Sequence, residues 1–394
     1  MDIPLSQPDI TESEINSVCD VLRTPNLSLG PKHLEFEEKM AAYVGSRYAI
    51  AVNSGTSGLH LALKSAGISE GDKVITSPFS FIASANVILF EKATPLFVDI
   101  APDTLNMDLD KTEELLKNAN RRKDKIKAIL VVHVFGQPCD MNRVMHLSKE
   151  YNCIVIEDAC EATGAEVIKS QEAGVGSRME EIKTQKVGSF GKAGVFAFYP
   201  NKQMTTGEGG MIVTNDEQAA RLCRSFRNQG RGEDGNWFAH ERLGYNYRLS
   251  DINCALGIAQ LERLEEMLGR REKVARMYNQ KLKELKEVKI PYVSPNVKIS
   301  WFVYVITLAE GLSGLRNQII NRLRQNGVSC SNYFAPIHLQ PFYVKMFGYK
   351  KGDYPITEDI SERTIALPFY NNLNEEQIDY IVKELKSAIG EVIR

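Results

Sequence analysis

Residues 194–215 read GVFAFYPNKQMTTGEGGMIVTN. The apolar run GVFAFY (194–199) predicts a buried strand, and Pro200 marks its end. A glycine-rich turn then leads to a second apolar strand, GMIVTN (210–215). Lys202 follows the first strand directly, just after the proline. Strands with such continuous apolarity are typical of the centre of a sheet that is covered on both faces.

The region upstream extends this pattern. Helical patterns alternate there with five more apolar runs, and together they predict βαβ units and a mostly parallel sheet. The runs are YAIAV (48–52), KVITS (73–77), TPLFVDI (94–100), IKAILVVHV (126–134) and CIVIEDA (153–159). We therefore expect an α/β fold, with a large domain built on a mostly parallel central sheet covered by helices. Such sheets bind ligands at the carboxyl ends of their strands, where Asn53, Asp99, Asp158 and Tyr199 fall.

After Asn246 the pattern changes. A heptad-like apolar series from Leu261 to Leu285 predicts one long helix that links two domains. The strand-like run at 299–308 and a helical pattern near 315–326 predict a smaller C-terminal α+β domain. A chain of 394 residues is also long for one compact domain, so we divide it into residues 1–262 and 263–394. The N-terminal residues could pack on the smaller domain, and residues 167–186 are polar enough for a surface excursion.

Composition excludes several classes of function. The formal net charge is -2, with 43% apolar and 25% charged residues, so nothing favours binding to nucleic acid or to an acidic membrane. No apolar run is long enough to span a bilayer, and we expect no signal peptide. The seven cysteines are scattered without a CxxC pair. This predicts no metal site and a reducing compartment, hence a cytoplasmic location.

Three segments together point to a cofactor. SGTSG (54–58) lies between a strand and a helical pattern, where backbone N–H groups can bind a phosphate, although a simple tight turn explains it equally well. Asp158 lies at the end of an apolar strand, where it either caps a helix or is a buried anion. Lys202 is either a solvated lysine or a reactive amine, and Phe81 or Phe79 could cover a flat ring. An amine, an anion and a phosphate loop are the groups that pyridoxal phosphate requires.

Many ordered segments of the chain resemble the DegT/DnrJ/EryC1/StrS family of pyridoxal phosphate-dependent sugar aminotransferases. They include GPKHLEFEEKMAAYVGSRYAIAVNSGTSGLHLAL, SPFSFIASANVI, VIEDACEATGA, FAFYPNKQMTTGEGGMIVTND, FRNQGR and LGYNYRLSDINCALGIAQLERL. The resemblance covers nearly the whole chain. It implies the aspartate aminotransferase fold (fold type I).

The resemblance also assigns site residues. It implies that Lys202 forms the internal aldimine and that Asp158 meets the pyridine nitrogen. It further implies cofactor contacts from Gly55, Thr56, Ser57, Phe81, Glu161 and, across the interface of a homodimer with shared active sites, Asn246. Three positions depart from the family pattern. Ala197 replaces a serine, Glu161 replaces a glutamine or histidine, and Gln229 replaces a frequent histidine. Arg231, Tyr333 and His338 are weaker candidates for contacts with the substrate.

The reaction that this resemblance implies is transfer of an amino group from L-glutamate to a nucleotide-linked keto-sugar, in the biosynthesis of a polysaccharide or a related sugar. Two alternatives use the same scaffold. A pyridoxal phosphate-dependent sugar dehydratase commonly has histidine in place of the lysine. A non-catalytic regulatory protein would have lost Lys202 or Asp158. No short motif in the sequence encodes the nucleotide, the keto position, the stereochemistry of the amine or the pathway.

Overall fold

The fold is built on a central sheet of seven strands. The computed structural model describes residues 1–168, 184–232 and 239–393. The strand order is β1-β9-β8-β5-β4-β2-β3, and all strands run parallel except β9, which is antiparallel to both of its neighbours. The strands are β1 (Tyr48–Val52), β2 (Lys73–Thr76), β3 (Thr94–Phe97), β4 (Ile126–Val132), β5 (Ile154–Asp158), β8 (Ala193–Ala197) and β9 (Gly210–Thr214). The predicted α/β class and the seven predicted strands are confirmed.

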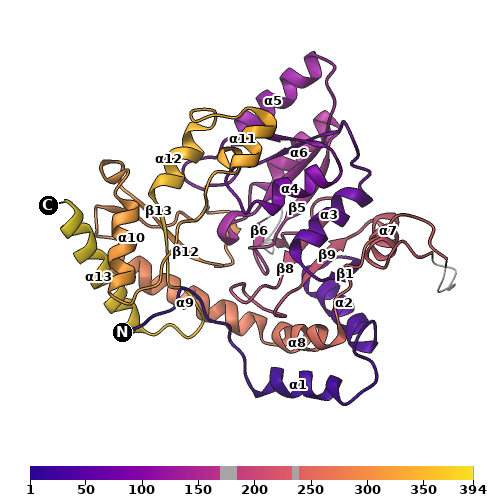
Figure 1. The fold of residues 1–394 in the computed structure, drawn as a ribbon, viewed down its shortest axis with the longest axis horizontal. Helices are drawn as coiled ribbons and strands as arrows, with labels where there is room; N and C mark the ends of the chain where they lie inside the picture. Colours follow the sequence, from indigo (N-terminus) through magenta and orange to yellow (C-terminus); the bar gives the residue numbers. More distant parts are fainter. Residues whose placement is uncertain (169–183, 233–238, 394) are drawn as a thin grey trace, which may run out of the picture.

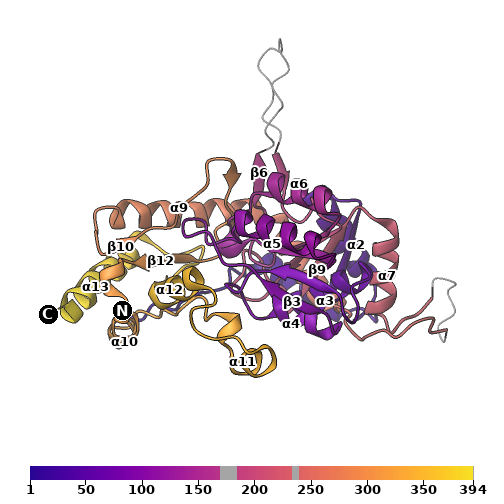
Figure 2. The same cartoon turned by 90° about the horizontal axis from the view of Figure 1, so that it is seen from above.

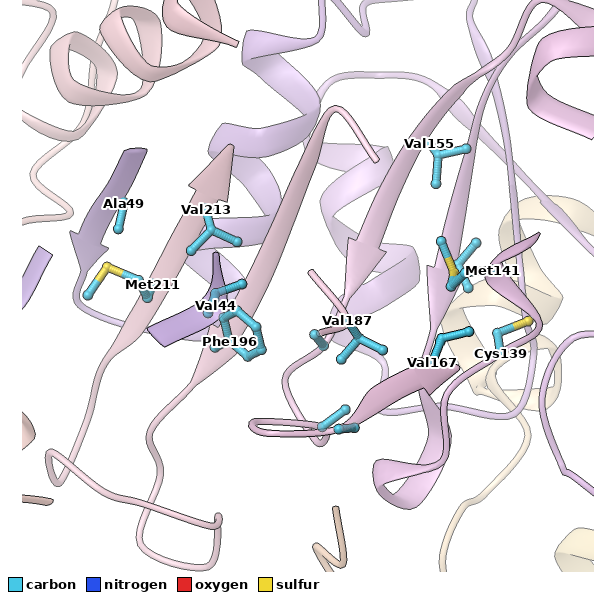
Figure 3. Packing of buried hydrophobic residues seen from close by; sticks show 14 of the residues in the cluster. Val44, Ala49, Cys139, Met141, Val155, Val167, Val187, Phe196, Met211 and Val213 are labelled. Carbon is cyan, nitrogen blue, oxygen red and sulfur yellow. The ribbon is translucent and has the colours of Figure 1, made fainter. Parts of the chain in front are cut away.

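Helices cover both faces of this sheet (Figures 1 and 2). Neighbouring residues of a strand face opposite sides, so Leu130 belongs to one apolar cluster while Ile129 and Val131 belong to the other. One face packs against α2 (Pro31–Val44), α5 (Leu109–Arg121), α6 (Met141–Tyr151) and α8 (Asp251–Glu262), and part of this packing is drawn in Figure 3. The other face packs against α3 (Gly55–Ser65), α4 (Ala83–Phe90) and α7 (Glu217–Arg227). The first helix, α1 (Glu12–Leu22), lies alongside α8.

The expected long helix is present, but a break at Arg263 separates its predicted start at Leu261 from the rest of the helix. Helix α8 ends at Glu262, and α9 (Leu264–Leu282) begins after Arg263, whose backbone angles are φ -102° and ψ 2°. The Arg263 guanidinium donates to Glu14 in α1 at 2.8 Å. A tertiary contact therefore holds the residue at the break, and the apolar spacing alone does not reveal it. Among the described residues, no helix is long and apolar enough to cross a membrane.

The C-terminal part contains a second, antiparallel sheet. Its strand order is β10-β12-β13, and it shares an apolar cluster with α9, α10 and α13. The elements are β10 (Val288–Lys289), β12 (Tyr304–Leu308), α10 (Arg316–Gln325), α11 (Pro341–Phe347), α12 (Pro355–Arg363), β13 (Thr364–Leu367) and α13 (Glu375–Ile393). Ile3 belongs to this cluster and bridges to Val328, so the N-terminus packs here. The division at residue 262 stays a prediction.

A third, small sheet lies at the base of the expected excursion at 167–186. It joins β6 (Glu166–Ile168), β7 (Thr184–Lys186) and β11 (Val297–Lys298), with β6 in the middle. Both ends of the predicted excursion are therefore paired strands. The rest of it, residues 169–183, lies outside the described residues.

Candidate active site

A cavity of ≈ 770 Å³ opens at the carboxyl ends of the central strands. Its walls come from the start of α3, the loop before α4, the ends of β5 and β8, and the segments around residues 302 and 333. Nine of the residues named from sequence or by resemblance line it: Gly55, Thr56, Phe81, Asp158, Glu161, Ala197, Tyr199, Lys202 and Tyr333. The fold therefore brings most of the predicted site together, at the edge of the sheet where parallel strands bind ligands.

The start of α3 forms one wall. Ser54 caps the helix by accepting from the Ser57 backbone N–H at 3.1 Å, and the two hydroxyl groups lie 2.9 Å apart. Ser54, Gly55 and Thr56 line the cavity, whereas Ser57 is buried behind them. A Cβ atom on Gly55 would lie 2.8 Å from the Ala197 Cβ and 2.9 Å from the Cys160 Sγ. Small residues thus leave the first N–H groups of the helix open to an anion.

Asp158 is the buried anion of the site. Only 6% of it is exposed, and its carboxylate accepts from the Ser84 hydroxyl at 2.7 Å and from the Cys160 N–H at 3.2 Å. No lysine, arginine or histidine within the described ranges forms an ion pair with it. A buried carboxylate without a cationic partner is costly, so this group suits a cationic ring nitrogen. The adjacent Glu157 faces the other way, as strand alternation predicts, and accepts from the Gly188 N–H at 2.7 Å.

Lys202 is the amine of the site. Its side chain is 13% exposed, and its Nζ lies 3.6 Å from Glu161 Oε1, which is longer than an ordinary hydrogen bond. The other carboxyl oxygen of Glu161 accepts from the Phe135 N–H at 2.9 Å. Burial raises the pKa of the Glu161 carboxyl, while the charge of Lys202 opposes that change. The acid at this position is therefore biased toward its neutral form.

The structure distinguishes the two candidate aromatic lids. Phe79 is fully buried and packs edge-on against Phe135 and Phe334, so it belongs to the core. Phe81 lines the cavity with 61% of its surface exposed, and Tyr199 lines it with 51% exposed. Rings with one face against a cavity are suited to cover a flat ligand. The stacking role of Phe81 stays a prediction.

Three other candidates lie outside this cavity. His338 is fully buried, and its Nε2 lies 3.0 Å from Glu358 Oε1, away from the residues that line the cavity. Burial lowers the pKa of its imidazole, although Glu358 opposes that change. Asn246 is exposed and bridges to Asn228. Arg231 lies beside a separate, arginine-rich cavity of ≈ 520 Å³. The structure of one chain does not bring these three residues together with Lys202.

Sequence reasoning missed several residues of the site. Ser84 and Phe302 are the clearest cases, because one binds the Asp158 carboxylate and the other contributes a cavity wall. Ser84 occurs in an ordinary apolar helix, and Phe302 precedes a strand in the second sheet. No local pattern distinguishes them from core residues, since each reaches the site through long-range packing.

Comparisons with known proteins agree with this geometry. Residues 8–386 match the DegT/DnrJ/EryC1/StrS aminotransferase family. The chain is 37% identical to a GDP-perosamine synthase of Caulobacter vibrioides, over 98% of both sequences.

Solved structures give the same result. The aminotransferase PseC of Helicobacter pylori, described as involved in pseudoaminic acid biosynthesis, is 27% identical. It superposes with a TM-score of 0.88 over 99% of this chain and 100% of that one. The putative sugar aminotransferase Spr1654 of Streptococcus pneumoniae, in its PLP form, is 28% identical with a TM-score of 0.88 over 100% of both chains.

Proposed function

The chain belongs to the DegT/DnrJ/EryC1/StrS aminotransferase family, and on that premise we propose that it moves an amino group from L-glutamate to a nucleotide-linked keto-sugar. Its class is that of the pyridoxal phosphate-dependent sugar aminotransferases. The donor, the nucleotide and the keto-sugar are the proposed part. One observation supports the cofactor chemistry on which the proposal depends. A largely buried amine, a buried anion with no cationic partner among the described residues and an open helix start share one cavity.

The residues of this cavity fit the cofactor. The N–H groups at the start of α3 would hold its phosphate, Asp158 its ring nitrogen, Phe81 one face of its ring and Lys202 its aldehyde carbon. When bound, pyridoxal phosphate supplies a carbonyl that takes up amino groups and a ring that withdraws electrons from the adjacent carbon. Ala197 brings no hydroxyl to the phosphate, so Ser54 and Thr56 are the nearby hydroxyl groups that can serve it.

The protein's own groups supply the proton transfers. In its neutral form, Nζ of Lys202 would take the proton from the donor carbon that carries nitrogen and deliver it to the former aldehyde carbon of the cofactor. With the keto-sugar bound, it would move a proton from that carbon to the sugar carbon that receives the nitrogen. Glu161 is 3.6 Å from Nζ of Lys202, and burial raises the pKa of its carboxyl while the charge of Lys202 opposes that change. Tyr333 lines the same cavity and is our candidate for contact with the sugar.

We also propose that the enzyme works as a homodimer with shared sites. Phe81 and Tyr199 line the cavity yet remain largely exposed, so its wall is incomplete in one chain. Asn246 is exposed and lies outside its own cavity, which suits a contact with the phosphate bound by the other subunit. Arg231, close to Asn246 through the Asn228 bridge, is a candidate for the diphosphate of the sugar nucleotide.

The free state of all seven cysteines supports a cytoplasmic location.

The test is a spectrum followed by a second substrate. The protein loaded with pyridoxal phosphate is mixed with L-glutamate alone, and conversion to the pyridoxamine form is followed by absorbance. UDP-, dTDP- and GDP-linked keto-sugars are then added separately, and the one that restores the starting spectrum is the acceptor. Lys202→Ala is the control, expected to abolish turnover. No conversion by glutamate would contradict the proposed donor, and no restoration by any sugar nucleotide would contradict the proposed acceptor.

A further inference from the structure

The Lys202 amine lies against an aromatic ring. Its Nζ is 3.7 Å from the centroid of the Phe302 ring, on the ring's face. Phe302 is buried, and Tyr333 packs almost parallel to it, at 6.4 Å and 8° between the rings. A cation over the face of an aromatic ring is attracted by the negative charge of that face, most strongly where water is excluded. The ring is therefore placed to hold the amine when it is charged.

Glu161 is the other group next to this amine. Its nearer oxygen is 3.6 Å from Nζ, outside the range of a hydrogen bond, and its other oxygen accepts from the Phe135 N–H. Burial raises the pKa of its carboxyl, which favours the neutral form. The two contacts are similar in length, 3.7 Å to the centroid of the Phe302 ring and 3.6 Å to the Glu161 oxygen. The ring keeps its attraction for the charged amine whatever the protonation state of Glu161.

A buried arginine ties the backbones of these two residues together. Arg271 in α9 is 2% exposed and donates from one nitrogen to the Phe302 carbonyl and from another to the Lys202 carbonyl, both at 3.1 Å. A third contact, to the Trp301 carbonyl, is 3.4 Å long. The guanidinium therefore spans the turn that carries the amine and the segment that carries the ring.

The setting of Arg271 is costly. No carboxylate in the described part of the chain forms an ion pair with it, its Nε has no hydrogen-bond partner there, and burial lowers its pKa to about 10. Carbonyl groups, the face of the Phe369 ring at 5.5 Å and the charge of Asp9 attract the guanidinium, but a charge buried in this way is still expensive compared with an apolar side chain of similar size. Such a residue needs a reason beyond stability, and its position between Lys202 and Phe302 supplies one.

A second side chain joins the same two segments. The amide nitrogen of Gln203, next to Lys202, donates to the Ser300 carbonyl at 3.0 Å and to the Glu161 carbonyl at 2.6 Å. Residues 202–203 are thus fastened to residues 300–302 at two points. The alignment of amine and ring follows from a rigid frame rather than from chance contact of two flexible side chains.

We propose that Phe302 is a positioning residue for Lys202, and that Arg271 holds the ring and the amine in register. When the nitrogen of the substrate, rather than Lys202, is attached to the cofactor, the Phe302 ring face keeps the charged Lys202 amine beside the reaction centre. The amine is then near enough to lose its proton and act as the base in the next transfer. This inference rests on pyridoxal phosphate-dependent transamination and holds for any amino donor.

The test varies the charge of the ring face at nearly constant shape. Phe302 is replaced by its mono-, di- and trifluorinated analogues in the full-length protein loaded with pyridoxamine phosphate, in which Lys202 is not bonded to the cofactor. Acetylation of Lys202 by acetic anhydride at one fixed pH is measured by mass spectrometry relative to Lys92, whose side chain is 73% exposed. Each fluorine weakens the ring's attraction for a cation, so more of the amine is neutral and reactive.

We expect Lys202 acetylation to rise stepwise, by about three- to tenfold with the trifluorinated ring. The same analogues at Phe97, a buried ring in a separate apolar cluster, control for effects of fluorine on packing and should leave the rate unchanged. A rate that is constant across the Phe302 series, or that changes equally in the Phe97 series, would overturn the role of the ring.

Arg271 is tested separately. Arg271→Met should raise Lys202 acetylation and lower kcat at least about tenfold with little change in KM. Arg271→Lys replaces the planar set of guanidinium donors by a single ammonium group. Its Lys202 acetylation and its kcat should lie between those of the original protein and those of Arg271→Met. Arg276→Met is the matched control, since this arginine of the same helix has 71% of its side chain exposed and pairs with Glu272. A folded Arg271→Met protein with unchanged acetylation and kcat would overturn the role of Arg271, and the fluorinated series decides the role of Phe302 even if that variant does not fold.

Discussion

Glu161 illustrates how one side chain is set by its surroundings. It is buried beside an amine, and its backbone carbonyl is held by Gln203. Desolvation favours the neutral carboxyl, and the charge of Lys202 favours the ionised one. The pKa is raised, so desolvation is the larger of the two effects. A glutamine at this position would resemble the neutral acid in shape and polarity.

The pH dependence of stability follows from that pKa. A carboxyl whose pKa is raised on folding stabilises the fold fully below the pKa of the unfolded chain, and this contribution is lost as pH rises through the folded value. We therefore expect Glu161→Gln to match the original protein in melting temperature at acidic pH and to exceed it increasingly toward neutral pH. Glu70→Gln, at a residue with a highly exposed carboxyl, is the control. A Glu161→Gln difference that is constant with pH would contradict the expectation.

Gly55 lies in the first turn of α3, where there is no room for a side chain. A methyl group there would press on Ala197 and Cys160, at 2.8 and 2.9 Å, and would push the helix start away from the strand beside it. We expect Gly55→Ala to cost about 1–3 kcal/mol of stability and to weaken cofactor affinity at least about tenfold. Equilibrium dialysis against pyridoxal phosphate and urea unfolding measure the two effects.

A second substitution checks the cause. Ala197→Gly removes the atom that the new methyl group of Gly55→Ala would meet first. The double variant should therefore recover part of the lost affinity, beyond the sum of the single effects. Equal affinities for the double variant and Gly55→Ala would show that the contact with Ala197 is not the cause.

Helix α12 depends on an acid from the central sheet. Asp99, just after β3, accepts from the Thr357 N–H and hydroxyl, both at 2.8 Å, and from the Ile356 N–H at 3.1 Å. Burial opposes ionisation of this carboxyl, but these donors outweigh it and lower its pKa. Asp99 is at a strand end, as ligand-binding residues often are, yet its partner is a helix of the C-terminal part.

Removal of this contact should destabilise the protein. We expect Asp99→Ala to cost about 1–3 kcal/mol in urea unfolding, because buried N–H groups lose their acceptor. Asp99→Asn, which keeps one acceptor oxygen, should cost less. The stabilisation by Asp99 is present above the pKa of the unfolded carboxyl and is lost as pH falls through the lower folded value. Equal losses for both variants would mean that acceptor geometry does not matter.

Active sites that are shared between two subunits can be tested by mixing subunits. A dimer of one Lys202→Ala chain and one Asn246→Ala chain would hold both defects in one site and none in the other. Random pairing of the two inactive variants should therefore restore about a quarter of the original sites. Activity that stays near zero after co-expression, with heterodimers present by mass spectrometry, would contradict sharing. Each variant expressed alone is the control.

The predictability of the fold differs between strand centres and strand ends. All seven central strands were predicted, because continuous apolarity follows directly from burial on both faces. The predicted run 94–100 ends three residues late, since Phe97 is the last paired residue of β3. Beyond Phe97, hydrogen bonds of Asp99 and of the loops replace the strand pairing, and their partners are distant in the sequence. The helix break at Arg263 has the same origin.

The class of fold and the family can be read from the sequence alone, because apolar runs, glycines and a lysine after a strand carry that information locally. The cofactor contacts assigned to Lys202 and Asp158 stay predictions. Only the tertiary structure decided which residues surround them. Phe302 and Arg271 come from segments 100 and 69 positions away from Lys202 in the chain, and Ser84 reaches Asp158 across 74. His338, a candidate for contact with the substrate, lies outside the cavity in a buried contact with Glu358. Such neighbours are set by how the sheet, α9 and the C-terminal part pack, and packing leaves no periodic trace in a single sequence.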